Sequence, residues 1–231
     1  MVRLRVIDAS DKRAIARLLA SARGDDPAFE RRVRSIVDGV RTGGDRALAR
    51  FAQRYDGLSG PLEVTAKEIR AAAARVEPAV RRAIAKAARH IALVAFRQIP
   101  KHFDFEVAPG VSVEQRVEPL ERVGCYVPGG RFPLPSSLLM TAVPASVAGV
   151  RDVVVVCPRP EPAVMAAALE AGVTRFFRAG GAHAVAALAY GTKTIPRVDK
   201  IVGPGNPMSP PPRRSSRATA PSTFTRGRPK S

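Results

Sequence analysis

The chain has 231 residues, of which 45% are hydrophobic and 25% are charged. This composition is typical of a folded globular protein and excludes disorder throughout the chain. The N-terminus has no apolar leader core, and no apolar run is long enough to cross a membrane. We therefore expect a cytoplasmic protein with no membrane partner.

The formal net charge of +18 makes a basic nucleic-acid-binding module one alternative. Six of the positive charges lie in residues 207–231, and most others are Arg scattered along Ala-rich segments. No DNA- or RNA-binding motif is present. We therefore attribute the charge to a general enrichment in Arg and expect no nucleic-acid partner.

The first hundred residues have apolar side chains at helical spacing. Helices are expected over 8–23 with Ser10 as a cap, over 27–44, over 44–57 with Gly57 as a stop, over 65–76, and over 78–99 with Pro78 in the first turn. The inward face of the helix expected over 27–44 includes Phe29, Val33, Ile36, Val37 and Val40.

The period changes after Pro100. Residues 102–107 and 111–120 alternate apolar and polar side chains around Pro109-Gly110, which predicts a β-hairpin. We expect residues 1–120 to form a helical region and hairpin that belong to an incomplete first domain.

From Glu121 the pattern repeats strand, glycine turn and helix, which predicts an α/β fold with a Rossmann-like parallel-sheet domain over 121–206 that is also incomplete. The first helix of this domain is expected to be capped by Ser136 or Ser137. Three glycine turns, at 124–130, 180–183 and 203–206, follow predicted parallel strands. Carboxyl ends of such strands meet at one edge, where open α/β sheets bind ligands.

Single residues say less about chemistry. Cys125 and Cys157 lack CxxC or Cys/His spacing and are expected in the core. His90 and His102 are expected to be structural or solvated, and no pair of histidines has metal-ligand spacing. Taken alone, His183 is expected to bond nearby backbone at a helix start rather than to act as a catalytic base. Tyr126 is expected to pack rather than to stack on a planar ring.

Two long segments resemble histidinol dehydrogenase: ERVGCYVPGGRFPLPSSLLMTAVPASVAGV and AGVTRFFRAGGAHAVAALAYGTKTIPRVDKIVGPGN. The resemblance extends over about residues 1–206. It implies an aldehyde-dehydrogenase-like architecture, a homodimer and a bound zinc ion. It also implies NAD-dependent oxidation of L-histidinol through L-histidinaldehyde to L-histidine, in histidine biosynthesis.

The resemblance also implies three NAD contacts. The family tyrosine of YVPGG corresponds to Tyr126, and the asparagine of GPGN corresponds to Asn206. The glutamine of the family's GGAQA corresponds to His183. Because imidazole reaches less far than an amide and can ionise, we expect this difference to affect cofactor affinity.

The family's zinc ligands and its acid/base pair lie downstream of GPGN, so we expect neither catalytic nor metal-binding residues here and no activity of the chain alone. A different aldehyde-dehydrogenase-like NAD enzyme is a further alternative, and it would need a cysteine nucleophile.

Residues 207–231 contain six prolines, six basic residues and no acidic residue, and we expect them to be disordered. Synonymous codons for this segment, shifted by one base, can encode AYVAAAKA and YAGPTE, which match family motifs. We therefore hypothesise a single-base frameshift at or just after Asn206, which resequencing of the coding DNA would test.

Overall fold

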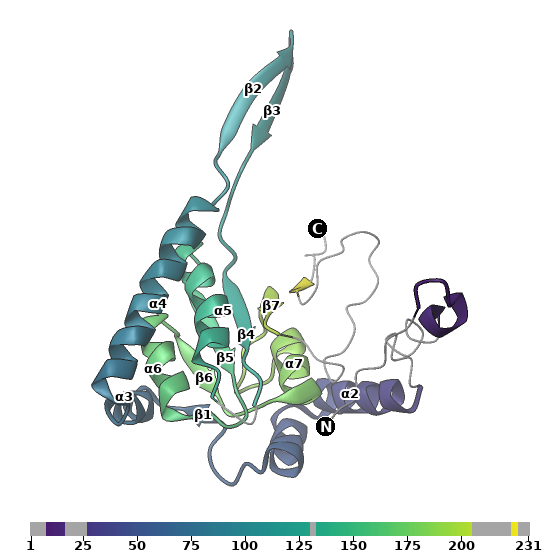
Figure 1. Cartoon of the computed structure of the whole chain (residues 1–231), viewed down its shortest axis with the longest axis vertical. Helices are drawn as coiled ribbons and strands as arrows, with labels where there is room; N and C mark the ends of the chain where they lie inside the picture. Colours follow the sequence, from purple (N-terminus) through teal and green to yellow (C-terminus); the bar gives the residue numbers. More distant parts are fainter. Residues whose placement is uncertain (1–7, 17–26, 130–132, 205–222, 226–231) are drawn as a thin grey trace.

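The structure is a computed structural model that describes residues 8–16, 27–129, 133–204 and 223–225. Figure 1 shows a central sheet with helices on both faces and a long hairpin that projects from the body. The α/β class and the parallel sheet expected from the sequence are therefore confirmed. None of the helices in these described ranges is long and apolar enough to cross a membrane.

The helix expected to begin at Ser10 has a different cap. Residues 12–16 are helical, and the Asp11 carboxylate accepts the Ala14 N–H at 2.9 Å. Ser10 instead bonds back to Asp8, donating its N–H and its hydroxyl. A carboxylate at the helix start satisfies a free amide better than the serine one residue earlier, so Asp11 is the cap.

Helix α2 (Pro27–Phe51) combines the two expected helices in one element with a break at Gly44, whose φ is 54°. It continues into the π-helical segment η1 (Ala52–Asp56), and Gly57 ends this segment in the left-handed region, as predicted. Val33, Ile36 and Val40 are buried, and Phe29 and Val37 pack partly buried beside Val33 and Ile36, which confirms the predicted inward face.

Helices α3 (Ala66–Ala74) and α4 (Pro78–Arg97) also confirm the sequence prediction. Thr65 and Glu68 form a capping box at the start of α3, with the Glu68 N–H donated to the threonine hydroxyl. Pro78 occupies the first turn of α4, where its missing N–H costs nothing.

The parallel strands are β4 (Arg122–Tyr126), β5 (Asp152–Val156), β6 (Arg175–Phe177) and β7 (Lys200–Val202). The sheet order is β1-β6-β5-β4-β7-β8, with β1 (Glu63–Val64) and β8 (Thr223–Thr225) antiparallel to their neighbours. The chain thus moves from β4 outward to β6 and then crosses back to place β7 on the other side of β4.

This reversal decides which face each helix covers. Helices α5 (Pro135–Val147) and α6 (Pro162–Glu170) pack on one face with α3 and α4 outside them, and α7 (Gly181–Tyr190) packs on the other with α2 (Figure 1). Right-handed crossovers require this change of face when the direction along the sheet reverses. The apolar cores lie between these helices and the sheet.

The expected cap of α5 is wrong. The helix begins at Pro135 after Leu134, with no side-chain cap, and Ser136 and Ser137 lie inside it. Proline is favoured at the first helical position because its φ is already helical, so the helix starts before the serines.

The hairpin predicted around Pro109-Gly110 is confirmed as β2 (Phe103–Ala108) and β3 (Val111–Gln115), with Gly110 at a φ of 78°. It extends beyond the C-terminal end of α4, and all but one of its residues are exposed (Figure 1). The division of the chain at residue 120 stays a prediction. Of residues 207–231, only Thr223–Thr225 are described, so the expected disorder of this segment also stays a prediction.

Candidate functional site

The four parallel strands end at one rim of the sheet. The order β6-β5-β4-β7 places the first strand, β4, next to the strand reached by the returning crossover, β7. The loop after β4 leads to α5 on one face and the loop after β6 leads to α7 on the other, so a crevice is expected between the carboxyl ends of β4 and β7. The rim beside Tyr126 and Gly203 is therefore the candidate site.

Tyr126 and the second glycine turn meet at this rim, as the sequence predicted. The Tyr126 hydroxyl accepts the Gly181 N–H at 3.2 Å, across 55 residues of sequence. Burial raises the pKa of this hydroxyl, and the hydrogen bond from Gly181 opposes the rise. The phenol is thus protonated at neutral pH, and its own O–H can donate to a ligand acceptor.

The other turns pack closely around the same point. A Cβ atom on Gly129 would lie 2.5 Å from Pro158 Cγ, and one on Gly180 would lie 2.8 Å from the same atom. A Cβ atom on Gly203 would overlap the Tyr126 carbonyl oxygen. The loops after β4, β5, β6 and β7 therefore touch one another, and the lack of side chains allows this close approach.

Asp56 is the rim residue that sequence reasoning missed. Its Oδ2 accepts the Gly180 N–H at 2.9 Å and lies 2.8 Å from His183 Nε2. The carboxylate thus occupies the N-terminal end of α7, where the helix dipole favours negative charge. An Asp just before a stop glycine gave no local signal of this role, because its partners lie more than 120 residues away.

His183 is buried, with 2% of its surface exposed, and its ring lies among aromatic side chains. Its ring centroid is 6.3 Å from that of Phe51 and 6.1 Å from that of Tyr55. The side chain therefore points toward the α2–η1 segment and Asp56. The expectation that a histidine at this helix start bonds nearby backbone is wrong, because its ring nitrogen meets a carboxylate 127 residues away.

Both cysteines are buried and free, as predicted. Burial raises the pKa of Cys125 and of Cys157 to about 12. Neither thiol is a nucleophile near neutral pH, because the thiolate is the reactive form. Cys157 lies at the rim, and its raised pKa disfavours the cysteine nucleophile that a different aldehyde-dehydrogenase-like enzyme would need.

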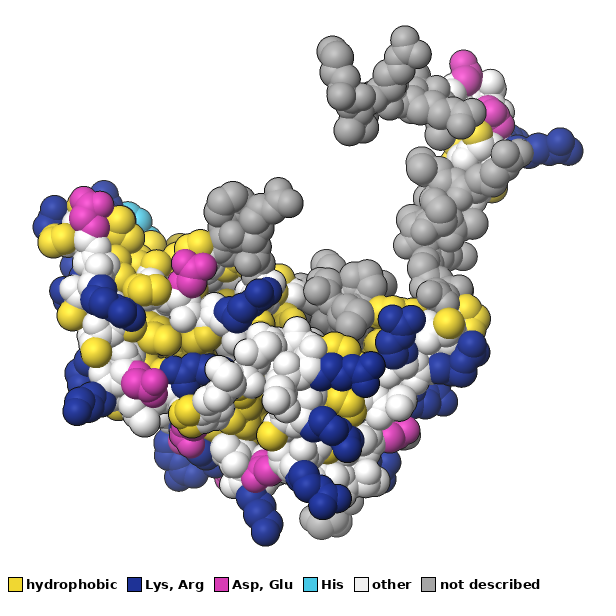
Figure 2. All heavy atoms as spheres, turned by 90° about the horizontal axis from the view of Figure 1, so that it is seen from below, with side chains coloured by type: hydrophobic (Ala, Val, Ile, Leu, Met, Phe, Trp, Pro, Cys, Tyr) yellow, Lys and Arg dark blue, Asp and Glu magenta, His cyan; other side chains and the backbone are white. Residues whose placement is uncertain are grey.

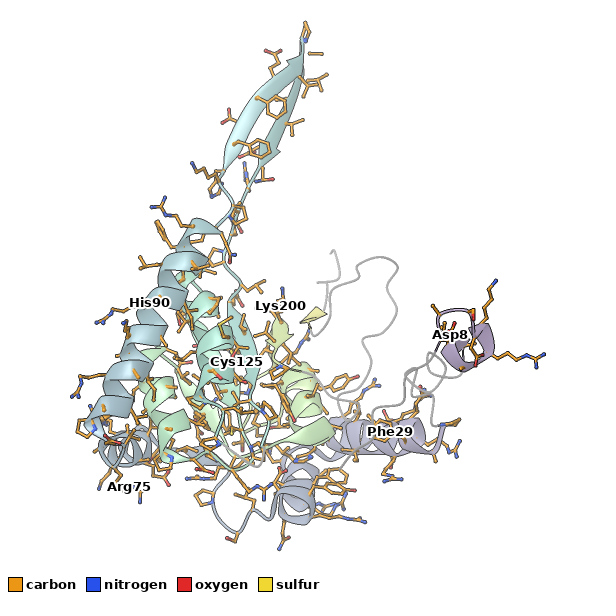
Figure 3. The ribbon with its side chains drawn as sticks, in the orientation of Figure 1. Asp8, Phe29, Arg75, His90, Cys125 and Lys200 are labelled. Carbon is orange, nitrogen blue, oxygen red and sulfur yellow. The ribbon has the colours of Figure 1, made fainter. Side chains whose placement is uncertain are left out.

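The described ranges contain no group of three or more His, Cys, Asp or Glu side chains that could hold a metal ion. His90 and His102 are both exposed, and Figure 3 shows His90 on α4 and Cys125 in the sheet. The described residues thus do not fit a zinc site and support no zinc-dependent step. Asn206 lies outside the described residues.

Two cavities adjoin the rim. A pocket of about 130 Å³ lies between the ends of β4 and β5 and is lined by Gly129, Leu134, Arg159 and Glu161, among others. A cleft of about 890 Å³, largely apolar, lies between α4, α5 and β7 and reaches the rim at Gly203 and Pro204.

On the face seen from below (Figure 2), the basic side chains do not form one continuous surface. Figure 2 shows Lys and Arg dispersed over the face seen from below, with hydrophobic side chains between them. A phosphate backbone is bound by clustered positive charge, so this distribution does not favour the nucleic-acid alternative.

The strand order and the rim define an open α/β protein with helices on both faces of its sheet and a glycine-lined switch point. A sequence model described as histidinol dehydrogenase matches residues 19–209. The chain therefore belongs to the histidinol dehydrogenase family, as its motifs predicted.

Individual relatives agree with this assignment. The histidinol dehydrogenase of Syntrophotalea carbinolica is 49% identical over 89% of this chain and 50% of its own length. That of Pseudomonas putida is 44% identical over 89% of this chain and 48% of its own. The chain thus spans about half the length of the curated relatives it matches.

A solved structure is similar as well. The crystal structure of histidinol dehydrogenase from Elizabethkingia anophelis matches with a TM-score of 0.70 and 30% identity, over 88% of this chain and 45% of that one. Neither the nucleic-acid alternative nor the other dehydrogenase alternative is favoured by these similarities.

Proposed function

We propose that this chain provides the NAD-binding part of a histidinol dehydrogenase, which oxidises L-histidinol through L-histidinaldehyde to L-histidine. The observation that carries the proposal is the contact between the Tyr126 hydroxyl and the Gly181 N–H at the β4/β7 switch point. It joins the two glycine turns at the rim where a dinucleotide would bind.

Tyr126 and Asn206 are the proposed direct NAD contacts. The contribution of His183, the third residue of the set, would be indirect, because its ring is buried against Asp56. The Tyr126 O–H would donate to an oxygen of NAD while its oxygen holds the Gly181 amide. The close glycines Gly129, Gly180 and Gly203 let the loops at the rim pack against Pro158 and Tyr126, which brings the turns together around the proposed site. When bound, NAD supplies the hydride acceptor for the oxidation.

We extend the proposal to the whole enzyme of the family. The whole enzyme would be a cytoplasmic homodimer with an aldehyde-dehydrogenase-like architecture. It would also hold a zinc ion, whose ligands would lie in the half of the family's length that this chain does not span. The acid/base residues would lie there too. We therefore expect no histidinol oxidation by the 231-residue chain, although it would bind NAD.

Binding of NADH to the purified chain tests the proposal, with fluorescence or calorimetry as the readout. Tyr126→Phe should weaken binding roughly 5- to 30-fold, because it removes the hydroxyl that would donate to NAD and leaves the Gly181 N–H without its acceptor. Tyr190→Phe, at the far end of α7, is the control and should leave the affinity unchanged. Absence of NADH binding by the wild-type chain would refute the proposal.

A zinc-supplemented assay with histidinol and NAD tests the second part. We expect no NADH formation, because the described residues hold no zinc cluster. Steady zinc-dependent turnover by this chain would overturn that expectation and would require a catalytic centre within the 231 residues.

A further inference from the structure

Asp56 is the last residue of η1, and it joins two parts of the chain that are distant in sequence. Its side chain is 9% exposed and faces the start of α7. A single oxygen, Oδ2, receives the Gly180 N–H and approaches His183 Nε2. One carboxylate atom thus contacts both the first and the last residue of the 180–183 turn.

The contacts continue from Asp56 to the rim. Gly180 precedes α7, and Gly181 follows with a φ of 54°, a conformation that favours glycine. The Gly181 N–H then meets the Tyr126 hydroxyl. Asp56, Gly180, Gly181 and Tyr126 thus form one connected series of hydrogen bonds and adjacent residues, and it begins on a helix outside the sheet.

The carboxylate also has an electrostatic effect. It lies at the positive end of the α7 dipole, where an anion is stabilised. Because Asp56 already accepts the Gly180 N–H, its negative charge opposes the binding of a cofactor phosphate beside that amide.

We infer that Asp56 is a positioning residue for the NAD site: it holds the Gly180-Gly181 turn in the conformation that presents Tyr126 to the cofactor. This inference rests on the proposed function for its ligand. Asp56 does not contact the cofactor, and it acts through the Gly180 amide and through His183. The N-terminal helical region is thereby part of the binding site.

The test compares Asp56→Ala and Asp56→Asn in the full chain. Alanine removes the acceptor, and NADH affinity should fall at least about tenfold, as expected when a buried amide loses its partner. Asparagine keeps an acceptor oxygen for the Gly180 N–H, so binding should stay within about threefold of wild type. Circular dichroism below the unfolding transition confirms that each variant is folded.

Asp45→Ala is the matched control. Asp45 lies on α2 and accepts the Thr194 N–H at 3.2 Å and the Thr194 hydroxyl at 2.9 Å, so it too joins the N-terminal segment to a distant loop. Its loss should lower stability and leave NADH affinity unchanged. Equal losses of affinity in Asp45→Ala and Asp56→Ala would reduce Asp56 to a general stabilising role and overturn the inference.

Hydrogen exchange without ligand gives a second readout. Asp56→Ala should speed exchange of the 180–183 amides at least about tenfold, while Asp45→Ala leaves these amides protected. If wild-type chain binds no NADH, the proposed function fails, and exchange alone decides whether Asp56 orders the turn. Unchanged exchange in Asp56→Ala, or tighter NADH binding by this variant, would overturn the inference.

Discussion

Substitution of Gly203 by alanine tests how tightly the rim is packed. Gly203 follows β7 directly, and its φ of 151° lies in a region that side chains rarely adopt. A Cβ atom there would overlap the Tyr126 carbonyl oxygen and lie 2.9 Å from Tyr126 Cβ. The neighbour is mainly backbone of a central strand, so it cannot turn aside as a flexible side chain could.

Two costs add in this variant. The backbone conformation costs about 1–3 kcal/mol for a residue other than glycine. Forcing an extra methyl into a packed site costs about 1–3 kcal/mol more. The free energy of unfolding should therefore fall by about 2–6 kcal/mol, which corresponds to a melting temperature lower by roughly 4–24 °C in a chain of this size.

Urea and thermal unfolding of the wild-type chain and of Gly203→Ala measure this loss of stability. Gly60→Ala is the matched control, because a Cβ atom on Gly60 meets nothing within 4 Å. It should change the free energy of unfolding by less than about 1 kcal/mol. If Gly203→Ala were as stable as Gly60→Ala, the close contact between β7 and Tyr126 would be wrong, and so would the convergence of turns on which the site depends.

Three further predictions concern the core and the exposed surface. Burial raises the pKa of Cys125 and Cys157 to about 12, whereas the thiols of the unfolded chain ionise near 9. The free energy of unfolding should therefore fall as pH rises from about 9 to 12, and the urea midpoint should fall with it. Rapid alkylation of the folded chain at pH 8 would contradict this prediction. Phe176→Ala, at a fully buried side chain, should cost about 3–5 kcal/mol in urea unfolding, against less than about 0.5 kcal/mol for the exposed Phe105→Ala. Replacing both Phe103 and Phe105 by serine should reduce aggregation measured by light scattering without lowering stability, because these neighbouring rings lie on an exposed apolar hairpin; unchanged aggregation would place the cause elsewhere.

Local signals in the sequence accounted for most elements. Apolar spacing located the helices from α2 to α7, and the Val-rich run at 152–156 gave a buried strand. Gly57 ends η1 and Gly110 turns the hairpin, and both adopt left-handed conformations that favour glycine. The sequence predicted both the stop and the turn. The two wrong caps, at Ser10 and at α5, failed because a neighbouring Asp or Pro satisfied the helix start better.

The sequence by itself determined the family, the order of strands and helices along the chain, and the glycine turns that make the rim possible. These depend on residues close together in the chain, whose spacing and turn chemistry act locally. Only the tertiary structure decided that Asp56 closes the end of α7, that His183 faces inward, and that Gly203 presses against Tyr126. Such contacts join residues tens to more than a hundred positions apart, and packing of the sheet against its helices, rather than any local preference, brings them together.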